Sequence, residues 1–82
     1  MNNESEIYTK IKELLVTNLQ VNEKQITPEA ELVADLGVNS LELADLILLC
    51  EETFDIEVDD RVIVNFITVK DVVDYLETVV KA

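Results

Sequence analysis

Apolar residues recur at helical spacing in three stretches of the chain. The first stretch predicts a helix over about residues 4–19, where Asn3 and Glu6 resemble a capping box. The last predicts a helix over about residues 69–80, with Thr68 and Asp71 as its capping pair. The positions on helical spacing are Ile7, Ile11, Leu14, Leu15 and Asn18, then Val69, Val72, Val73, Leu76, Val79 and Val80.

The middle stretch predicts a helix over about residues 41–54 with a well-marked start. Asn39 can cap this helix, Glu42 stands at the third helical position, and Val38 can pack against Leu43 across the cap. Ser40 therefore falls in the first turn. The helix is apolar on two sides. The core stripe is Leu43, Leu46, Ile47, Cys50 and Phe54, and the second stripe is Leu41, Ala44 and Leu48.

Two segments lack this regular pattern. Residues 20–38 contain the breakers Pro28 and Gly37 and predict a long loop, held by scattered apolar anchors. The anchors are Val21, Ile26, Leu32 and Leu36. Residues 61–67 are rich in β-branched side chains, which favour a strand, yet no partner strand is available elsewhere. We expect a short helix there.

These elements together predict an all-α protein, a small four-helix bundle of three main helices and one short helix, with a long loop between helices one and two. At 82 residues the chain fits a single domain spanning residues 1–82. Hydrophobic residues make up 49% of it, which indicates a folded chain despite its acidity.

The net charge is −12, with 18 acidic and six basic residues. Such a charge would repel nucleic acid and anionic membranes and favours basic proteins as partners, although from composition alone solubility is the first explanation of the acidity. Cys50 has no partner for a disulfide and lies in an apolar run, so we expect a buried thiol in a reducing cytoplasm. The start of the chain lacks the pattern of a signal peptide, and no apolar run approaches the roughly 20 residues that insert across a membrane.

Few residues offer catalytic chemistry. The chain has no histidine, and Cys50 lacks the base that usually activates a nucleophile, so we expect no enzyme. The acidic residues between positions 51 and 60 do not follow the calcium-loop pattern, so no metal site beyond weak surface binding of cations is expected.

Ser40 is the hydroxyl of interest. A serine at a helix start is usually a cap, but Asn39 already fills that role and leaves Ser40 free to face outward. A phosphate on Ser40 would lie beside unpaired N–H groups at the positive end of the helix.

Residues 35–42, with the sequence Asp35-Leu36-Gly37-Val38-Asn39-Ser40-Leu41-Glu42, resemble the phosphopantetheine attachment motif of acyl carrier proteins. The resemblance covers essentially the whole chain, since further matches are Glu51-Glu52, Phe54-Asp55, Glu57, Ile67-Thr68-Val69 and Asp74-Tyr75-Leu76.

The resemblance implies that a separate transferase attaches the 4′-phosphopantetheine of coenzyme A to Ser40. The arm would then carry acyl groups as thioesters, and the chain would be a cytoplasmic monomer. Phosphopantetheinyl transferase and acyl-processing enzymes with basic patches would dock around the arm. The docking residues implied are Asn39, Leu41, Glu42, Ala44, Asp45, Leu48, Glu51 and Glu52. For Ala44 and Leu48 a core position is an equal alternative.

Two departures from the family pattern bear on the pathway. Asn39 replaces the aspartate usual beside the modified serine, and residues 61–64 are more apolar than the third helix of fatty-acid carriers. Type II fatty acid synthesis is the first expectation. A specialised carrier for a polyketide, lipid-modification or aminoacyl-loading pathway is the alternative, and an unmodified helical adaptor is a third.

Overall fold

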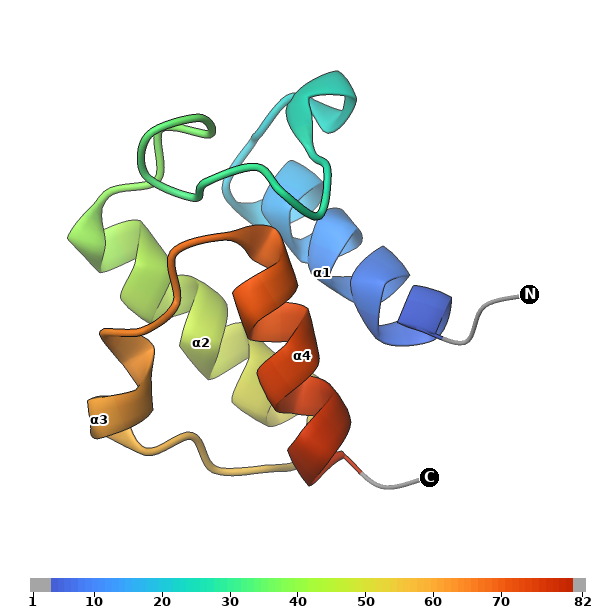
Figure 1. The fold of residues 1–82 in the computed structure, drawn as a ribbon, viewed down its shortest axis with the longest axis vertical. Helices are drawn as coiled ribbons and strands as arrows, with labels where there is room; N and C mark the ends of the chain where they lie inside the picture. The colour runs from blue at the N-terminus through green and yellow to red at the C-terminus, as the bar shows by residue number, and fades with distance from the viewer. Residues whose placement is uncertain (1–3, 81–82) are drawn as a thin grey trace.

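The computed structural model describes residues 4–80 and shows a small helical bundle (Figure 1). Its elements in chain order are α1 (Glu4–Asn18), the 3₁₀ turn η1 (Glu23–Gln25), α2 (Ser40–Phe54), α3 (Asp60–Ile63) and α4 (Val69–Val79). No strand occurs in this part of the chain, and an isolated antiparallel bridge joins Glu31 to Thr68. The all-α prediction of three main helices and one short helix is confirmed.

The helix starts follow local capping chemistry. Thr68 Oγ1 accepts a hydrogen bond from the Asp71 N–H, and the Asp71 carboxylate accepts one from the Thr68 N–H, so the predicted cap of α4 is confirmed. The predicted box of Asn3 and Glu6 lies outside the described residues. The first helix ends at Asn18, one residue before the predicted boundary, because Gln20 adopts the left-handed conformation.

Residues 61–67 form the predicted short helix only in part. Asp59 caps α3 through a hydrogen bond from the Arg61 N–H, and the helix ends at Ile63. Phe66 then turns inward and is buried, with its ring 5.6 Å from that of Tyr75. The chain therefore leaves the short helix before Phe66, whose ring packs in the core.

The core lies where α1, α2 and α4 meet. Its fully buried side chains are Ile11, Leu15, Leu32, Val38, Leu46, Cys50, Val69, Val72 and Leu76. The predicted core stripe of α2 is buried or half-buried. Most of the periodic apolar residues of α4 are buried as well, whereas Val79, the last residue of that helix, is 37% exposed.

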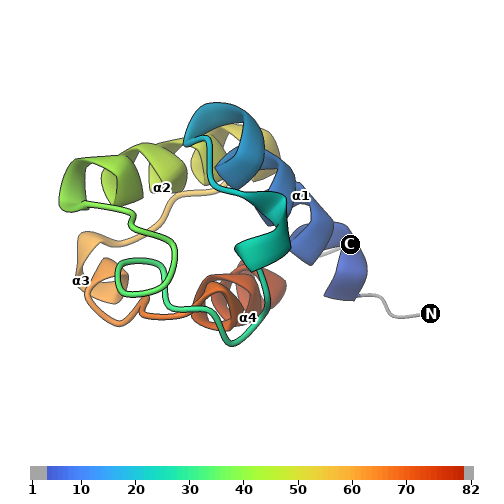
Figure 2. The same ribbon diagram turned by 90° about the horizontal axis from the view of Figure 1, so that it is seen from above.

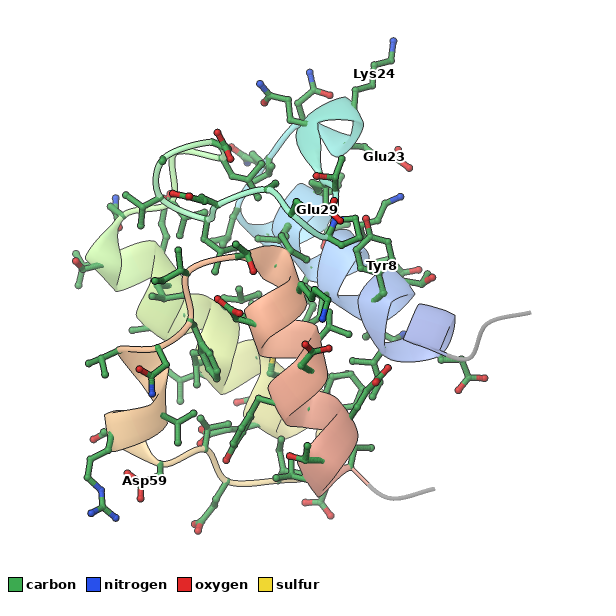
Figure 3. All side chains as sticks on the ribbon, in the orientation of Figure 1. Tyr8, Glu23, Lys24, Glu29 and Asp59 are labelled. Carbon is green, nitrogen blue, oxygen red and sulfur yellow. The ribbon has the colours of Figure 1, made fainter. Side chains whose placement is uncertain are left out.

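The long loop crosses the end of the bundle where α1 finishes and α2 and α4 begin (Figures 1 and 2). Its predicted anchors Val21, Ile26 and Leu32 are buried, and Leu36 is half-buried. The Tyr8 hydroxyl donates a hydrogen bond to the Ile26 carbonyl at 3.3 Å, and Figure 3 shows Tyr8 beside Glu29 of the loop. Burial and the nearby Glu29 charge raise the pKa of Tyr8. The loop is thus a packed part of the fold that leads to Ser40.

Candidate functional site

The start of α2 presents Ser40 to solvent. Ser40 is the first residue of the helix and is exposed. Asn39 Oδ1 accepts a hydrogen bond from the Glu42 N–H at 2.8 Å, and Glu42 Oε1 accepts one from the Asn39 N–H at 3.1 Å. The predicted capping box is confirmed. Because this cap is complete without the Ser40 hydroxyl, that hydroxyl is left free for chemistry.

A fixed turn leads into the site. Gly37 has φ of 73°, in the left-handed region that favours glycine, although a side chain there would meet no atom within 4 Å. The backbone conformation at position 37, rather than a lack of room for a side chain, therefore favours glycine there. Val38 follows and is buried, so only Asn39 separates an anchored residue from Ser40.

The helix start suits a covalently attached phosphate. The first backbone N–H groups of α2 have no partner within the helix and carry the positive end of its dipole. Glu42 is the acidic residue of this first turn, and its carboxylate is already occupied by the Asn39 N–H. An exposed serine hydroxyl at this position thus fits the phosphodiester of a phosphopantetheine arm.

The second apolar stripe of α2 faces solvent. Leu41 is 77% exposed and Leu48 is 56% exposed, while Ala44 is also exposed. These exposures exclude a core position for the three residues. The carboxylates of Asp45 and Glu52 are exposed beside the stripe.

Glu51 has a structural contact of its own. Its Oε2 accepts a hydrogen bond from the Val58 N–H at 2.7 Å, which ties the end of α2 to the segment before α3. Glu42 and Glu51 are therefore both half-buried and partly engaged with backbone, unlike Asp45 and Glu52.

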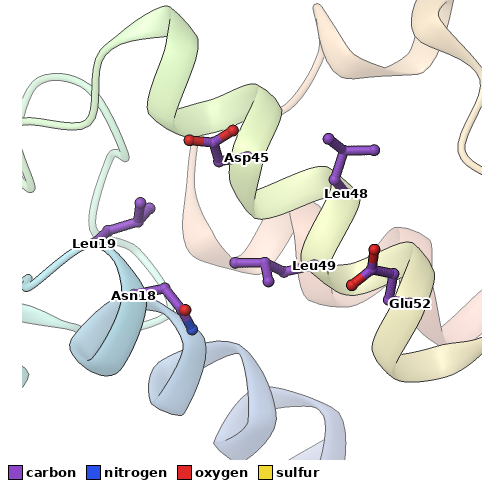
Figure 4. A pocket seen from close by; sticks show the side chains of 6 residues that line it. All are labelled: Asn18, Leu19, Asp45, Leu48, Leu49 and Glu52. Atoms are coloured by element: carbon purple, nitrogen blue, oxygen red, sulfur yellow. The ribbon is translucent and has the colours of Figure 1, made fainter.

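A pocket of about 340 Å³ opens between the end of α1 and the outer side of α2 (Figure 4). It is lined by Asn18, Leu19, Asp45, Leu48, Leu49 and Glu52. The pattern of α2 pointed to Asp45, Leu48 and Glu52, but sequence reasoning did not predict that Asn18 and Leu19 would line a pocket with them. Nothing in their local pattern signals this role, because only the packing of α1 on α2 brings them to the pocket.

The charges of α2 are one-sided. The helix contains Glu42, Asp45, Glu51 and Glu52 but neither Lys nor Arg. In the described part of the chain, every ion pair lies outside α2. The pairs are scattered over the molecule, as Figure 3 shows for Asp59 and Glu23, which belong to two different pairs. The pairs are Lys10–Glu13, Lys12–Glu23, Arg61–Asp59 and Lys70–Asp74. The negative charge of α2 is thus not neutralised by any ion pair among the described residues.

Cys50 lies on the opposite side of α2, fully buried as predicted. Burial, with a smaller contribution from the Glu51 charge, raises the pKa of its thiol to about 12. A protonated, enclosed thiol is not a nucleophile, so Cys50 is a core residue.

Known proteins are similar to this chain over most of its length. The phosphopantetheine attachment site family matches residues 9–76. The chain belongs to the acyl carrier protein family. It is 42% identical over 77 residues to an acyl carrier protein of Thermotoga maritima, covering 94% of this chain and 95% of that protein. It is 42% identical over 72 residues to one of Wolinella succinogenes, covering 88% and 95%, and 43% identical over 67 residues to one of Syntrophobacter fumaroxidans, covering 82% and 83%.

Membership of the acyl carrier protein family defines the general role of the chain. It is a carrier rather than an enzyme, its prosthetic group is 4′-phosphopantetheine, and its partners are acyl-processing enzymes. No helix within residues 4–80 has the length and apolar character needed to cross a membrane. Among the described side chains, no three Cys, Asp or Glu residues lie close enough together to hold a metal ion.

Proposed function

We propose that Ser40 carries the 4′-phosphopantetheine arm and that the chain transports acyl intermediates in type II fatty acid biosynthesis. The observation that supports this assignment is that Ser40 is exposed at the start of α2 and that its hydroxyl takes no part in the helix cap. In the loading reaction the Ser40 oxygen bonds to the pyrophosphate phosphorus of coenzyme A that bears the pantetheine. The bond from this phosphorus to the bridging oxygen breaks, adenosine 3′,5′-bisphosphate leaves with that oxygen, and the serine proton passes to the transferase. The attached group supplies a terminal thiol that holds an acyl chain as a thioester.

The docking surface in this proposal is the exposed side of α2 below Ser40. Leu41, Ala44 and Leu48 offer apolar contact, and the carboxylates of Asp45 and Glu52 flank them. Asn39, Glu42 and Glu51 border this surface. A basic transferase or acyl-processing enzyme matches such a surface in charge, which raises the rate of encounter and fixes orientation.

The proposal also includes the domain organisation and the location of the protein: a single acyl carrier domain over residues 1–82, acting as a cytoplasmic monomer. The unpaired, buried Cys50 supports a reducing compartment.

A specialised carrier is the second candidate. Asn39 lacks the charge usual beside the modified serine, and Val64, at the end of α3, is 79% exposed. A partner enzyme that contacts the carrier through apolar side chains instead of basic ones would match both the uncharged Asn39 and the exposed Val64. Intact-mass measurement of the protein from its native host distinguishes the two pathways by the mass of the acyl group on the arm.

The attachment site is tested by loading with coenzyme A and a broad-specificity transferase. We expect Ser40→Ala to fold normally and to remain unmodified, because its hydroxyl takes no part in the cap. Thr53→Ala is the matched control, since Thr53 is another exposed hydroxyl residue of α2. Tandem mass spectrometry that finds the arm on another residue, or no arm on the wild-type chain beside a loaded reference carrier, contradicts the assignment and favours an unmodified adaptor.

The docking surface is tested by charge reversal. We expect Asp45→Lys and Glu52→Lys each to raise the KM of the transferase for the carrier by up to about five-fold at low salt, since an exposed charge contact contributes roughly 1 kcal/mol or less. Glu77→Lys on α4 changes the net charge equally and is the control. Equal effects from all three variants would show that only total charge matters.

A further inference from the structure

The segment that leads to Ser40 is attached by hydrogen bonds to the start of α4. The Leu32 N–H donates to the Ile67 carbonyl at 2.8 Å, and the Val69 N–H donates to the Ala30 carbonyl at 3.0 Å. Between these two bonds, Glu31 and Thr68 form the isolated antiparallel bridge. Figure 2 shows the loop passing over the start of α4, far along the chain from it. The position of this loop is therefore set by α4.

Two aspartates fix the two sides of the bridge. Asp71 Oδ2 accepts hydrogen bonds from the Thr68 N–H at 2.9 Å and the Ile67 N–H at 3.0 Å. Asp35 Oδ2 accepts one from the Glu31 N–H at 2.8 Å. Hydrogen bonds to a charged acceptor are stronger than neutral ones. We call the bridge with its two aspartates, Asp35 and Asp71, the 31–68 clip.

The clip continues directly into the turn before Ser40. The Val38 N–H donates to the Leu32 carbonyl at 2.9 Å, so Leu32, whose own N–H bonds to Ile67 beside the clip, also closes the base of the turn. Both Leu32 and Val38 are buried in the core. Only Asn39 then lies between this closed base and Ser40. A change in the clip is thus transmitted over a short, anchored stretch of backbone to the start of α2.

We infer that Asp35 and Asp71 are positioning residues for the modification of Ser40. The inference rests on the proposed function, in which a transferase must engage Ser40 and the surface of α2 together. Neither aspartate is the residue modified; both hold the turn from which Ser40 is presented. When the clip opens, the turn samples other conformations, and only the competent fraction binds the transferase. Loss of either aspartate should therefore raise KM and leave kcat unchanged.

Asp35→Ala and Asp71→Ala test the inference in the full chain. We expect each to raise the KM of phosphopantetheine transfer by roughly five-fold, the equivalent of about one hydrogen bond. The comparison is made at a temperature where circular dichroism shows every variant fully folded. Amide hydrogen exchange at Leu32 and Val69, which donate across the clip, should become faster. Asp35→Asn and Asp71→Asn keep an acceptor oxygen and should restore most of the wild-type KM.

Asp74→Ala is the matched control, because Asp74 is exposed on α4 and pairs only with Lys70 among the described contacts. An effect of Asp74→Ala as large as that of Asp71→Ala would overturn the inference by showing that charge alone matters. An unchanged KM with faster exchange at Leu32 and Val69 would overturn it as well, since the clip would then be open without consequence at Ser40. If the wild-type chain is not modified at Ser40, the proposed function and this inference fail together. A failure confined to the KM of the variants leaves the proposed function intact.

Discussion

Asn39 combines two roles that substitution can separate, because the residue caps α2 and also stands beside Ser40. Its Oδ1 accepts the Glu42 N–H at 2.8 Å, and its own N–H donates to Glu42 Oε1 at 3.1 Å. Asn39→Ala removes the side-chain acceptor and should cost about 1 kcal/mol of folding free energy. For a domain of this size that loss lowers the melting temperature by roughly 4–8 °C.

Asn39→Asp keeps the acceptor and adds a negative charge. The helix dipole favours that charge by roughly 0.3–1 kcal/mol, while the nearby Glu42 and the net charge of −12 oppose it. We therefore expect little change in stability. The restored charge should instead speed phosphopantetheine transfer by a general transferase, by at most about five-fold, because one exposed contact contributes roughly 1 kcal/mol or less. The gain should shrink in high salt, where the screening length falls to about 3 Å.

The assay combines thermal unfolding of the three proteins with steady-state loading kinetics at low and high ionic strength. Asn39→Ala separates loss of the cap from gain of charge. Two results would refute the reasoning: an alanine variant as stable as the wild type, or an aspartate variant that loads no faster at low salt. An advantage that survives high salt undiminished would show that the effect of Asn39 is not electrostatic.

Two further predictions concern the core and the buried thiol. Leu46→Ala should cost about 2–5 kcal/mol because Leu46 is fully buried, whereas Leu48→Ala, at a residue 56% exposed, should change stability by about 0.5 kcal/mol or less. Urea titration measures both, and similar losses would contradict the assignment of one stripe to the core and the other to solvent. Burial raises the pKa of the Cys50 thiol to about 12 in the folded protein. Unfolding exposes the thiol to water, and its pKa falls back to the ordinary value of about 9. The folded state binds that proton more tightly, so the stability from Cys50 is present at neutral pH and is lost as pH rises from about 9 toward about 12. Cys50→Ala should make the fall of stability over this range less steep, and parallel curves for the two proteins would refute the prediction.

Local chemistry made the helix starts predictable. The caps of α2 and α4 depend on side chains three residues apart, Asn39 with Glu42 and Thr68 with Asp71, so the sequence contains all the atoms involved. Ser40 could be singled out for the same reason, since a neighbour fills the capping role. Its assignment as the attachment site came from the resemblance of the surrounding motif and stays a proposal.

Tertiary structure decided what depends on contacts between distant segments. Periodicity left Leu48 between core and surface, because a helix with two apolar stripes does not show which of them its neighbours cover; packing of α2 leaves Leu48 56% exposed. The pairing of Glu31 with Thr68 joins residues 37 positions apart, and neither neighbourhood signals the other. Asn18 and Leu19 reach the pocket only because α1 packs beside α2. The sequence by itself determined where α2 and α4 begin and which side chains are apolar, while the packing of the helices determined which of those side chains are buried and which are exposed.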